Sequence, residues 1–403
     1  MTKMPFPVEL LSLTLEYLGG DLKTLKSCSL ACHDLNYISK PLLFHTVKLK
    51  STSDIQSLAD LVQREPRIGD LIQELITVDS SITSEQLVSL STLLPTLLPN
   101  LRFLKLSEVS RPPQIAPSFL RDALMSFKTI KDFSFHGYSY ALPFEVASSL
   151  TSLDCLSIRY YGTQARDPPP EMPPLTPDLH LTVFSFHAPP SAPVDLAFSW
   201  ILSTSSRYSL RAVKLFVPQP HAEVYGSFLR ELGPALNHLD LTFPPSVNMT
   251  GENSCTCTVL AQTPSLIILS RLSAASPHIH LGENTGLRSL VVRNVPSPFL
   301  RVLLSTISIT SVESITIFVP SLCGEDYWDY VESQSLRQID GQHFWSLKEL
   351  VFVFRGYPED KLTTQQKVEE IFQRYHQTNV LKFIDTPEFE ERCLGLGFGR
   401  SLL

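Results

Sequence analysis

Side chains that could perform catalysis or bind a metal are few and scattered along this chain of 403 residues. The sequence contains no G-x-S-x-G turn for a nucleophilic serine, no G-x-x-x-x-G-K-[ST] loop for a phosphate and no H-E-x-x-H helix for zinc. His278 and His280 could face the same side of a strand, but no third metal ligand is evident beside them. We therefore expect a protein that is not an enzyme and that uses no cofactor or metal.

Cysteines supply the remaining candidates for metal or redox chemistry. Cys28, Cys32 and His33 lie close together, but no second pair follows at zinc-finger spacing, and both cysteines fall on an apolar helical face. Cys255 and Cys257 lie in a polar segment and form an equally weak candidate site. Because the total of 7 cysteines is odd and spread over a long chain, reduced thiols are favoured over a disulfide framework.

The composition describes a folded protein with an acidic balance. Hydrophobic residues make up 43% of the chain and charged residues 18%, which is typical of ordered domains with ample cores. A formal net charge of -7 and the lack of a Lys/Arg block argue against nucleic-acid binding. No long apolar run and no secretory leader are evident, so we expect no membrane span and a cytoplasmic or nuclear location.

The elements that must position any functional residue begin with three short helices within residues 1–46. Pro7 suits the first turn of a helix, because its missing N–H costs nothing there. Asp21 is a good N-cap for a second helix, and Ile38 lies in a third that Pro41 is expected to end. Such a small unit buries little surface, so it should depend on a partner or on the domain that follows.

In order and spacing, this segment resembles an F-box. The residues that match the family pattern are Phe6-Pro7, Glu9-Leu10-Leu11, Tyr17-Leu18, Asp21-Leu22, Cys28-Ser29-Leu30, Cys32 and Leu43-Phe44. Leu35 stands where the family has Trp, and Thr14 stands where an apolar residue is usual. The alternative is a generic helical cap on a larger domain.

The resemblance implies docking to a small Skp adaptor and, through it, to a cullin and a RING protein. The residues carried over for this contact or its immediate support are Pro7, Leu10, Leu11, Leu22, Leu25, Leu30 and Cys32.

The rest of the chain repeats the pattern apolar-x-x-apolar-x-apolar. Copies begin at Phe44, Leu101, Ile130, Leu153, Leu181, Leu210, Leu236, Leu287, Val312 and Leu347, with a weaker copy at Ile72. Most intervals lie in or near the range of about 20 to 29 residues that is typical of leucine-rich repeats. The step of 51 residues from Leu236 to Leu287 indicates a hidden unit, with a strand expected near residues 266–269.

Helical stripes lie between these copies, as at residues 55–62, 196–201 and 224–229. A strand and a helix per unit cannot bury their apolar faces alone, so neighbouring units should stack. Together with the helical segment, the chain resembles F-box proteins with divergent leucine-rich repeats, of a kind common in fungi. The alternative is an ordinary α/β domain with parallel strands.

The predicted fold class is therefore α/β, with a three-helix F-box over residues 1–46 and a leucine-rich-repeat-like α/β solenoid, or horseshoe, over 47–386. A proline-rich loop at 166–178 and a polar loop at 244–258 interrupt the solenoid, and residues 387–403 form a C-terminal tail. A helix over 365–376 and a strand over 380–384 should cap its last open edge.

Positions between the apolar residues of each strand should face solvent on the concave side. The residues predicted to contact a protein substrate there are Phe103, Lys105, Asp132, His136, Arg159, His187, Lys214, Phe216, His238, Asp240, Arg293, Phe318 and Glu349. The resemblance thus implies the substrate-recognition subunit of an SCF-type ubiquitin ligase. The alternative is a non-catalytic repeat scaffold whose F-box, altered at Leu35 and Thr14, does not engage the ubiquitin machinery.

Overall fold

The computed structural model of this chain describes residues 7–18, 21–77, 94–109, 127–162, 178–218, 221–244, 279, 281–294, 300, 303–304, 311–319, 346–354, 362, 365–366, 368–370, 372–387 and 389. The chain divides into two compact units, Met1–Gly162 with Pro170–Pro173 and Pro174–Leu403 with Thr163–Pro169.

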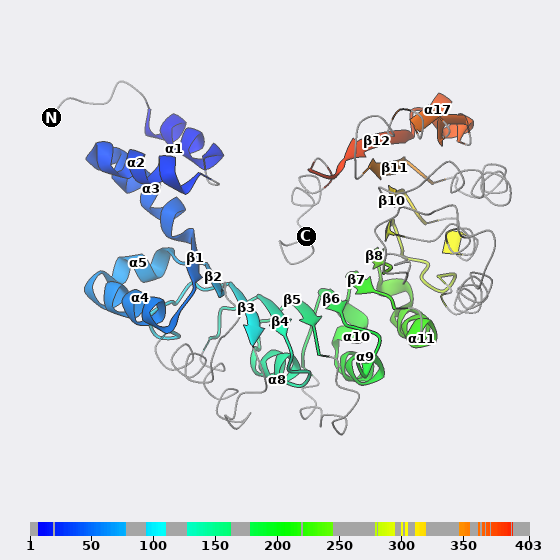
Figure 1. Cartoon of the computed structure of the whole chain (residues 1–403), viewed down its shortest axis with the longest axis horizontal. Helices are drawn as coiled ribbons and strands as arrows, with labels where there is room; N and C mark the ends of the chain where they lie inside the picture. The colour runs from blue at the N-terminus through cyan, green and yellow to red at the C-terminus, as the bar shows by residue number, and fades with distance from the viewer. Residues whose placement is uncertain are drawn as a thin grey trace, which may run out of the picture. The chain divides into compact units, whose positions relative to one another are not determined.

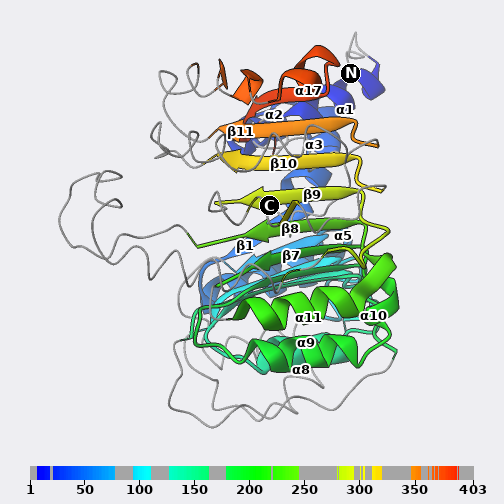
Figure 2. The same cartoon turned by 90° about the vertical axis from the view of Figure 1, so that its right-hand side faces the viewer.

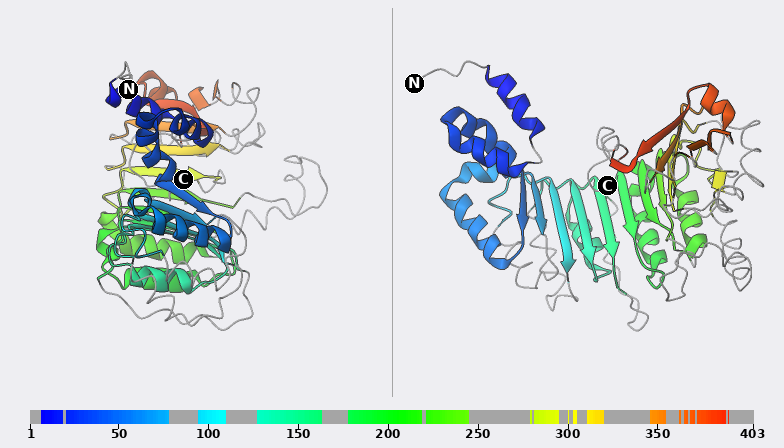
Figure 3. Two further views of the ribbon diagram at one scale, coloured as in Figure 1. Left: turned by 90° about the vertical axis from the view of Figure 1, so that its left-hand side faces the viewer. Right: turned by 45° about the horizontal axis from the view of Figure 1, so that its top comes forward.

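The first unit begins with three helices and continues into parallel strands. Its described elements are α1 (Val8–Tyr17), α2 (Leu22–Ala31), α3 (His33–His45), β1 (Thr46–Leu49), α4 (Thr52–Arg64), α5 (Pro66–Leu71), β2 (Glu74–Thr77), β3 (Phe103–Val109), β4 (Asp132–Gly137), α8 (Leu142–Ser149) and β5 (Cys155–Tyr160). Each strand from β1 to β5 pairs in parallel with the next one along the chain. In Figures 1 and 3, α4, α5 and α8 lie on one side of these strands.

The second unit continues the same alternation. Its described elements are β6 (Val183–His187), α9 (Val194–Leu202), α10 (Ser206–Ser209), β7 (Ala212–Phe216), α11 (Ala222–Leu232), the 3-10 helix η2 (Gly233–Ala235), β8 (His238–Thr242), β9 (Ser289–Arg293), β10 (Ser314–Val319), β11 (Glu349–Phe354), α17 (Gln373–Gln377) and β12 (Leu381–Asp385). The strands β6 to β12 again pair in parallel and in chain order. Figure 2 shows the labelled strands of this unit side by side and pointing the same way.

Strand alternation gives each sheet two different faces. Phe184 and Phe186 of β6 pack against the rings of Phe228 in α11 and Phe198 in α9, so the predicted apolar positions point toward the helices. We call this side of each sheet the helix face and the opposite side the open face. The predicted strand copies are confirmed, since each coincides with a strand whose apolar positions are buried, with Val47 of β1 as the half-buried exception.

Backbone hydrogen bonds at the starts of the strands recur from unit to unit. The carbonyl of Gln73 accepts from the N–H groups of Arg102 and Phe103 at 2.9 and 3.0 Å. The carbonyl of Arg211 accepts in the same way from Asn237 and His238 at 2.8 and 2.9 Å. This repetition of one connection, with one strand per turn of chain, is the structure of a repeat protein.

Pro41 does not end the third helix, contrary to the sequence-based expectation. The helix α3 runs through it to His45, and Leu42 and Leu43 pack against the core of the three helices. Proline inside a helix removes one hydrogen bond. Burial of the two leucines that follow offsets this loss, because they reach the core only if the helix continues.

The hidden repeat unit expected between Leu236 and Leu287 does not form a rung of the sheet. The strands β8 and β9 are hydrogen-bonded neighbours, with Leu239 opposite Leu290, so no strand fits between them. The long interval is therefore an insertion between two adjacent strands.

Other predictions lie wholly or largely outside the described residues. These are the strand near 266–269, the proline-rich loop 166–178, the polar loop 244–258, the candidate ligands Cys255, Cys257, His278 and His280, and the tail 387–403 apart from residues 387 and 389.

Candidate protein-interaction surfaces

The helices α1, α2 and α3 pack around a small core of their own. Leu15, Leu25 and Ile38 are buried at its centre, one from each helix. The side chains packed against them are Leu11, Leu18, Cys28, Leu35, Leu42 and Leu43. Since α3 ends at His45 and β1 begins at Thr46, no linker separates this core from the first strand.

Asp21 begins α2, as the sequence predicts. Its Oδ1 accepts hydrogen bonds from the backbone N–H groups of Lys23 and Thr24, both at 3.1 Å, and its Oδ2 accepts one from the Thr24 hydroxyl. These bonds, first the one from the Thr24 side chain, lower the pKa of the Asp21 carboxyl. The cap thereby fixes where α2 starts after the turn that follows α1.

Apolar side chains that the small core does not use remain exposed on the three helices. We call the following six residues the apolar helix surface: Leu10, Leu13, Tyr17, Leu22, Leu30 and Tyr37. Leu30 is 86% exposed and Tyr17 92% exposed. Several large apolar side chains exposed on one small module are what a partner-binding surface would use.

The structure separates the predicted adaptor residues by their burial. Those that are exposed are Pro7, Leu10, Leu22 and Leu30. Leu25 is fully buried, and Leu11 packs against the core that contains it. Cys32 caps α3, because its Sγ accepts a hydrogen bond from the N–H of Leu35 at 3.5 Å. Their role in adaptor binding stays a prediction, and the exposed four are the ones available to a partner.

The predicted adaptor residues do not include Leu13, Tyr17 and Tyr37, which are exposed as well. The signal was present in α1, since Leu10, Leu13 and Tyr17 follow helical spacing and form a second apolar stripe. The first stripe, through Leu11 and residues 15 and 18, already filled the core.

The two departures from the F-box pattern are accommodated locally. The Thr14 hydroxyl donates to the carbonyl of Leu10 at 2.7 Å within α1, and Leu35 packs against the core of the three helices. Neither residue leaves a buried polar group without a partner.

The open face of the first unit carries cations in the middle of its strands. Lys48 and Lys105 both lie opposite Ile76 in register, and His136 lies opposite Arg159. In the described part of the chain, Lys48, Lys105 and Arg159 form no ion pair with a carboxylate. Burial lowers the pKa of Lys105, and the positive charges of Arg159 and Lys48 lower it further.

Carboxylates of this face lie at the starts of the same strands. Glu74 accepts a hydrogen bond from the Thr46 hydroxyl at 2.6 Å, and its other carboxylate oxygen lies 3.5 Å from Nε2 of His45. Burial raises the pKa of Asp132, and the negative charge of Asp154 raises it further. The open face of the first unit is therefore acidic at the strand starts and basic farther along.

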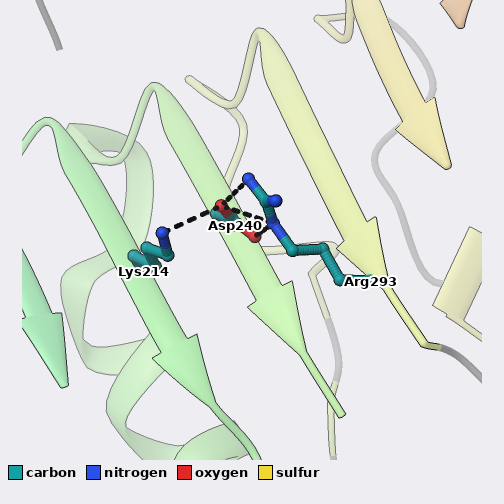
Figure 4. Close-up of polar contacts among 3 residues, drawn as sticks. All are labelled: Lys214, Asp240 and Arg293. Atoms are coloured by element: carbon teal, nitrogen blue, oxygen red, sulfur yellow. Dashed lines mark hydrogen bonds and ion pairs between the residues drawn. The ribbon is translucent and has the colours of Figure 1, made fainter. Parts of the chain in front are cut away.

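On the open face of the second unit, one buried carboxylate holds two cations. Asp240 lies between Lys214 and Arg293, as Figure 4 shows. The guanidinium Nε donates to Oδ1 and Oδ2 of Asp240 at 3.0 and 3.1 Å, and Nη2 donates to Oδ2 at 2.9 Å. The Lys214 ammonium lies 4.0 Å from Oδ2, and only 5% of the Asp240 side chain is exposed. This arrangement gives both cations the same internal countercharge.

Aromatic rings cover the same charge cluster. The Arg293 guanidinium lies 4.1 Å from the ring centroid of Phe318 and 5.3 Å from that of Phe389. The two rings meet edge to face, and they share a buried cluster with Val291, Val351, Val353 and Ile384. Phe389, in the predicted tail, thus packs on the open face instead of leaving it to solvent.

The predicted substrate residues differ widely in exposure. Arg159 is exposed; the half-buried residues are Phe103, Lys105, Asp132, His136, His187, Lys214, Phe216, Arg293 and Glu349. His238, Asp240 and Phe318 are buried, so the expectation that they face solvent is wrong. Phe389 covers Phe318, and Asp240 is paired with cations from the two neighbouring strands.

His238 lies in this buried region. Burial lowers the pKa of its imidazole to about 4; the negative Asp240 opposes this shift, and the positive Arg293 and Lys214 add to it. His187 and Phe216, on neighbouring strands of the same face, stack with their ring centroids 4.0 Å apart.

Among the described residues, no group of three or more His, Cys, Asp or Glu side chains could hold a metal ion. No helix in that part of the chain is sufficiently long and apolar to cross a membrane.

Comparison with known proteins gives no family. No family model and no curated protein matches this sequence. Among solved structures, the chain is similar to the crystal structure of a Rad7 and Elc1 complex in yeast, at 13% identity, over 85% of this chain and 86% of that chain, with a TM-score of 0.28. Similarity at this level carries no argument about function, so any assignment depends on the contacts of the chain itself.

Proposed function

We propose that this chain is the substrate-recognition subunit of an SCF-type ubiquitin ligase. Its helices α1 to α3 bind a Skp adaptor, which connects to a cullin and a RING protein, and its repeat strands bind the protein to be modified. The chain itself performs no chemical step.

The observation that carries this proposal is the apolar helix surface. Leu10, Leu22 and Leu30 belong to the motif that resembles an F-box, and they are exposed on a module whose core is already filled by other leucines. A partner that buries them would add apolar contact area to a module that is small by itself. Apolar anchors that are buried together usually dominate the affinity of such an interface.

The absence of a linker between α3 and β1 supports the same function. Because α3 leads directly into β1, one chain would hold the adaptor on α1 to α3 and the partner protein on the repeat strands. Each bound protein is then present at a raised effective concentration near the other.

The test is co-purification of the full chain with a Skp adaptor. Leu30→Ala and Leu10→Ala should each weaken the complex by about 2 kcal/mol, or about thirtyfold in Kd. Leu362→Ala is the matched control, since Leu362 is 63% exposed and lies in the second unit. A complex that does not form, or that the double variant of Leu10 and Leu30 leaves unchanged, would contradict the proposal in favour of the scaffold alternative.

A further inference from the structure

Three cations on the open face of the first unit form a strip that crosses its strands. We call Lys48 of β1, Lys105 of β3 and Arg159 of β5 the basic strip. Lys48, Ile76 and Lys105 lie opposite one another in neighbouring strands and so form one row across the sheet. Arg159 lies two residues farther along the strands, in the next row on the same face. The strand register thereby brings three positive side chains, from residues far apart in the sequence, to one face.

The protein does not neutralise this strip. None of the three cations pairs with a carboxylate in the described part of the chain, and Glu74 of the same sheet is engaged by Thr46. Burial and mutual repulsion lower the pKa of Lys105, so the strip is held at an energetic cost. An anion bound beside Lys105 would remove that cost.

Between Lys105 and Arg159 the open face carries short polar side chains. Ser134 and Ser157 lie in the same row as Lys105, and both are buried because their side chains are short. The Ser134 hydroxyl lies 3.5 Å from Nε2 of His136. Tyr138, directly after β4, is 46% exposed, and its ring lies 5.9 Å from that of Tyr161. Polar side chains thus lie within the strip, and an exposed aromatic ring follows the end of β4.

We propose that the basic strip binds an extended acidic segment of a partner protein, with carboxylates paired to Lys105 and Arg159 and a further one to Lys48. The inference rests on the proposed function, for which it names the class of substrate segment. Neighbouring strands lie about 4.8 Å apart, so the strip from β1 to β5 spans about 19 Å of backbone and one carboxylate cannot pair with all three cations. Several acidic residues in one segment are required, and a single small anion would satisfy only part of the strip.

A protein segment fits this face better than a nucleic acid does. The whole chain has a net charge of -7, and the carboxylates of Glu74 and Asp132 flank the strip at the strand starts. A continuous phosphate backbone would be repelled by this acidic edge, whereas a peptide can place carboxylates only where the cations lie.

The experiment uses the full chain and a fluorescein-labelled peptide of alternating Glu and Ser, followed by fluorescence anisotropy. The Glu peptide should bind at least about tenfold more tightly than the same peptide with Gln for Glu. Lys105→Gln and Arg159→Gln should each weaken its binding about tenfold. Arg102→Gln is the matched control, because it removes the same charge from an exposed residue just before β3 and should change binding less than about twofold.

Three results would overturn the inference. These are equal binding of the Glu and Gln peptides, an equal loss with Arg102→Gln, and tighter binding of a single-stranded oligonucleotide that depends on Lys105 and Arg159. Adaptor capture distinguishes the two proposals. Variants of Lys105 and Arg159 that still capture the adaptor but bind the peptide weakly would support both proposals. A wild-type chain that captures the adaptor but does not bind the Glu peptide would contradict only the binding of an acidic segment.

Discussion

The open faces of the two units are both formed by parallel strands, but their charged side chains are arranged in opposite ways. In the first unit, Lys48, Lys105 and Arg159 have no carboxylate partner among the described residues. In the second, Lys214 and Arg293 share the buried Asp240, and Phe389 covers the neighbouring ring of Phe318. The charges of the second face therefore stabilise the fold, and the cations of the first face are available to the acidic segment proposed above.

The largest expected effect comes from removing the carboxylate of the second face. Asp240→Asn leaves Arg293 and Lys214 half-buried without a countercharge, which should lower the free energy of unfolding by about 4 kcal/mol. Urea denaturation measures it. The matched control is Glu231→Gln, whose partner Arg207 lies at the surface, with an expected loss of about 0.5 kcal/mol or less. Equal losses in the two variants would contradict the structural role of Asp240.

The next effect concerns the aromatic cover. Phe389→Ala removes a side chain that is 6% exposed and contacts Phe318 and Arg293, so a loss of about 3 kcal/mol is expected. Urea denaturation again gives the value, and Phe389→Leu, which keeps most of the apolar volume, should lose clearly less. If Phe389→Ala is as stable as the wild type, the segment after β12 does not cover this face.

His238 makes the stability of the second face depend on pH. Its pKa is about 4 in the folded chain and about 6.5 when unfolded, so between these values the unfolded chain binds more protons. Stability therefore falls as the pH drops through this window, by about 2 kcal/mol between pH 7 and pH 5. Denaturation at several pH values measures the slope, and His238→Gln should flatten it by that amount. A slope unchanged by this substitution would contradict the assignment.

The sequence predicts those features of the fold that depend on residues close together in the chain. The strands were found because every second residue of each apolar pattern must face the helices, as Phe184 and Phe186 do. The N-cap at Asp21 was equally local.

What the sequence could not predict depends on contacts between distant residues. Phe389 belongs to a segment with no repeat pattern, and nothing in its neighbours indicates that it packs on Phe318. The helix continues through Pro41 because Leu42 and Leu43 reach a core formed by α1 and α2. Asp240 and Arg293 are 53 residues apart in sequence, so their pairing follows from strand order.

The smallest expected effect has the opposite sign and lies on the first face. Lys105→Met keeps the length and apolar contacts of the side chain but removes a half-buried charge that Arg159 and Lys48 repel. The free energy of unfolding should therefore rise by about 0.5 kcal/mol, whereas Asp240→Asn on the second face lowers it. Because the same substitution should also weaken binding of the acidic peptide about tenfold, stability and binding would be opposed at one residue, as is common at functional sites. A Lys105→Met chain that is clearly less stable than the wild type would show that Lys105 has an internal partner, and the contrast between the two faces would then be wrong.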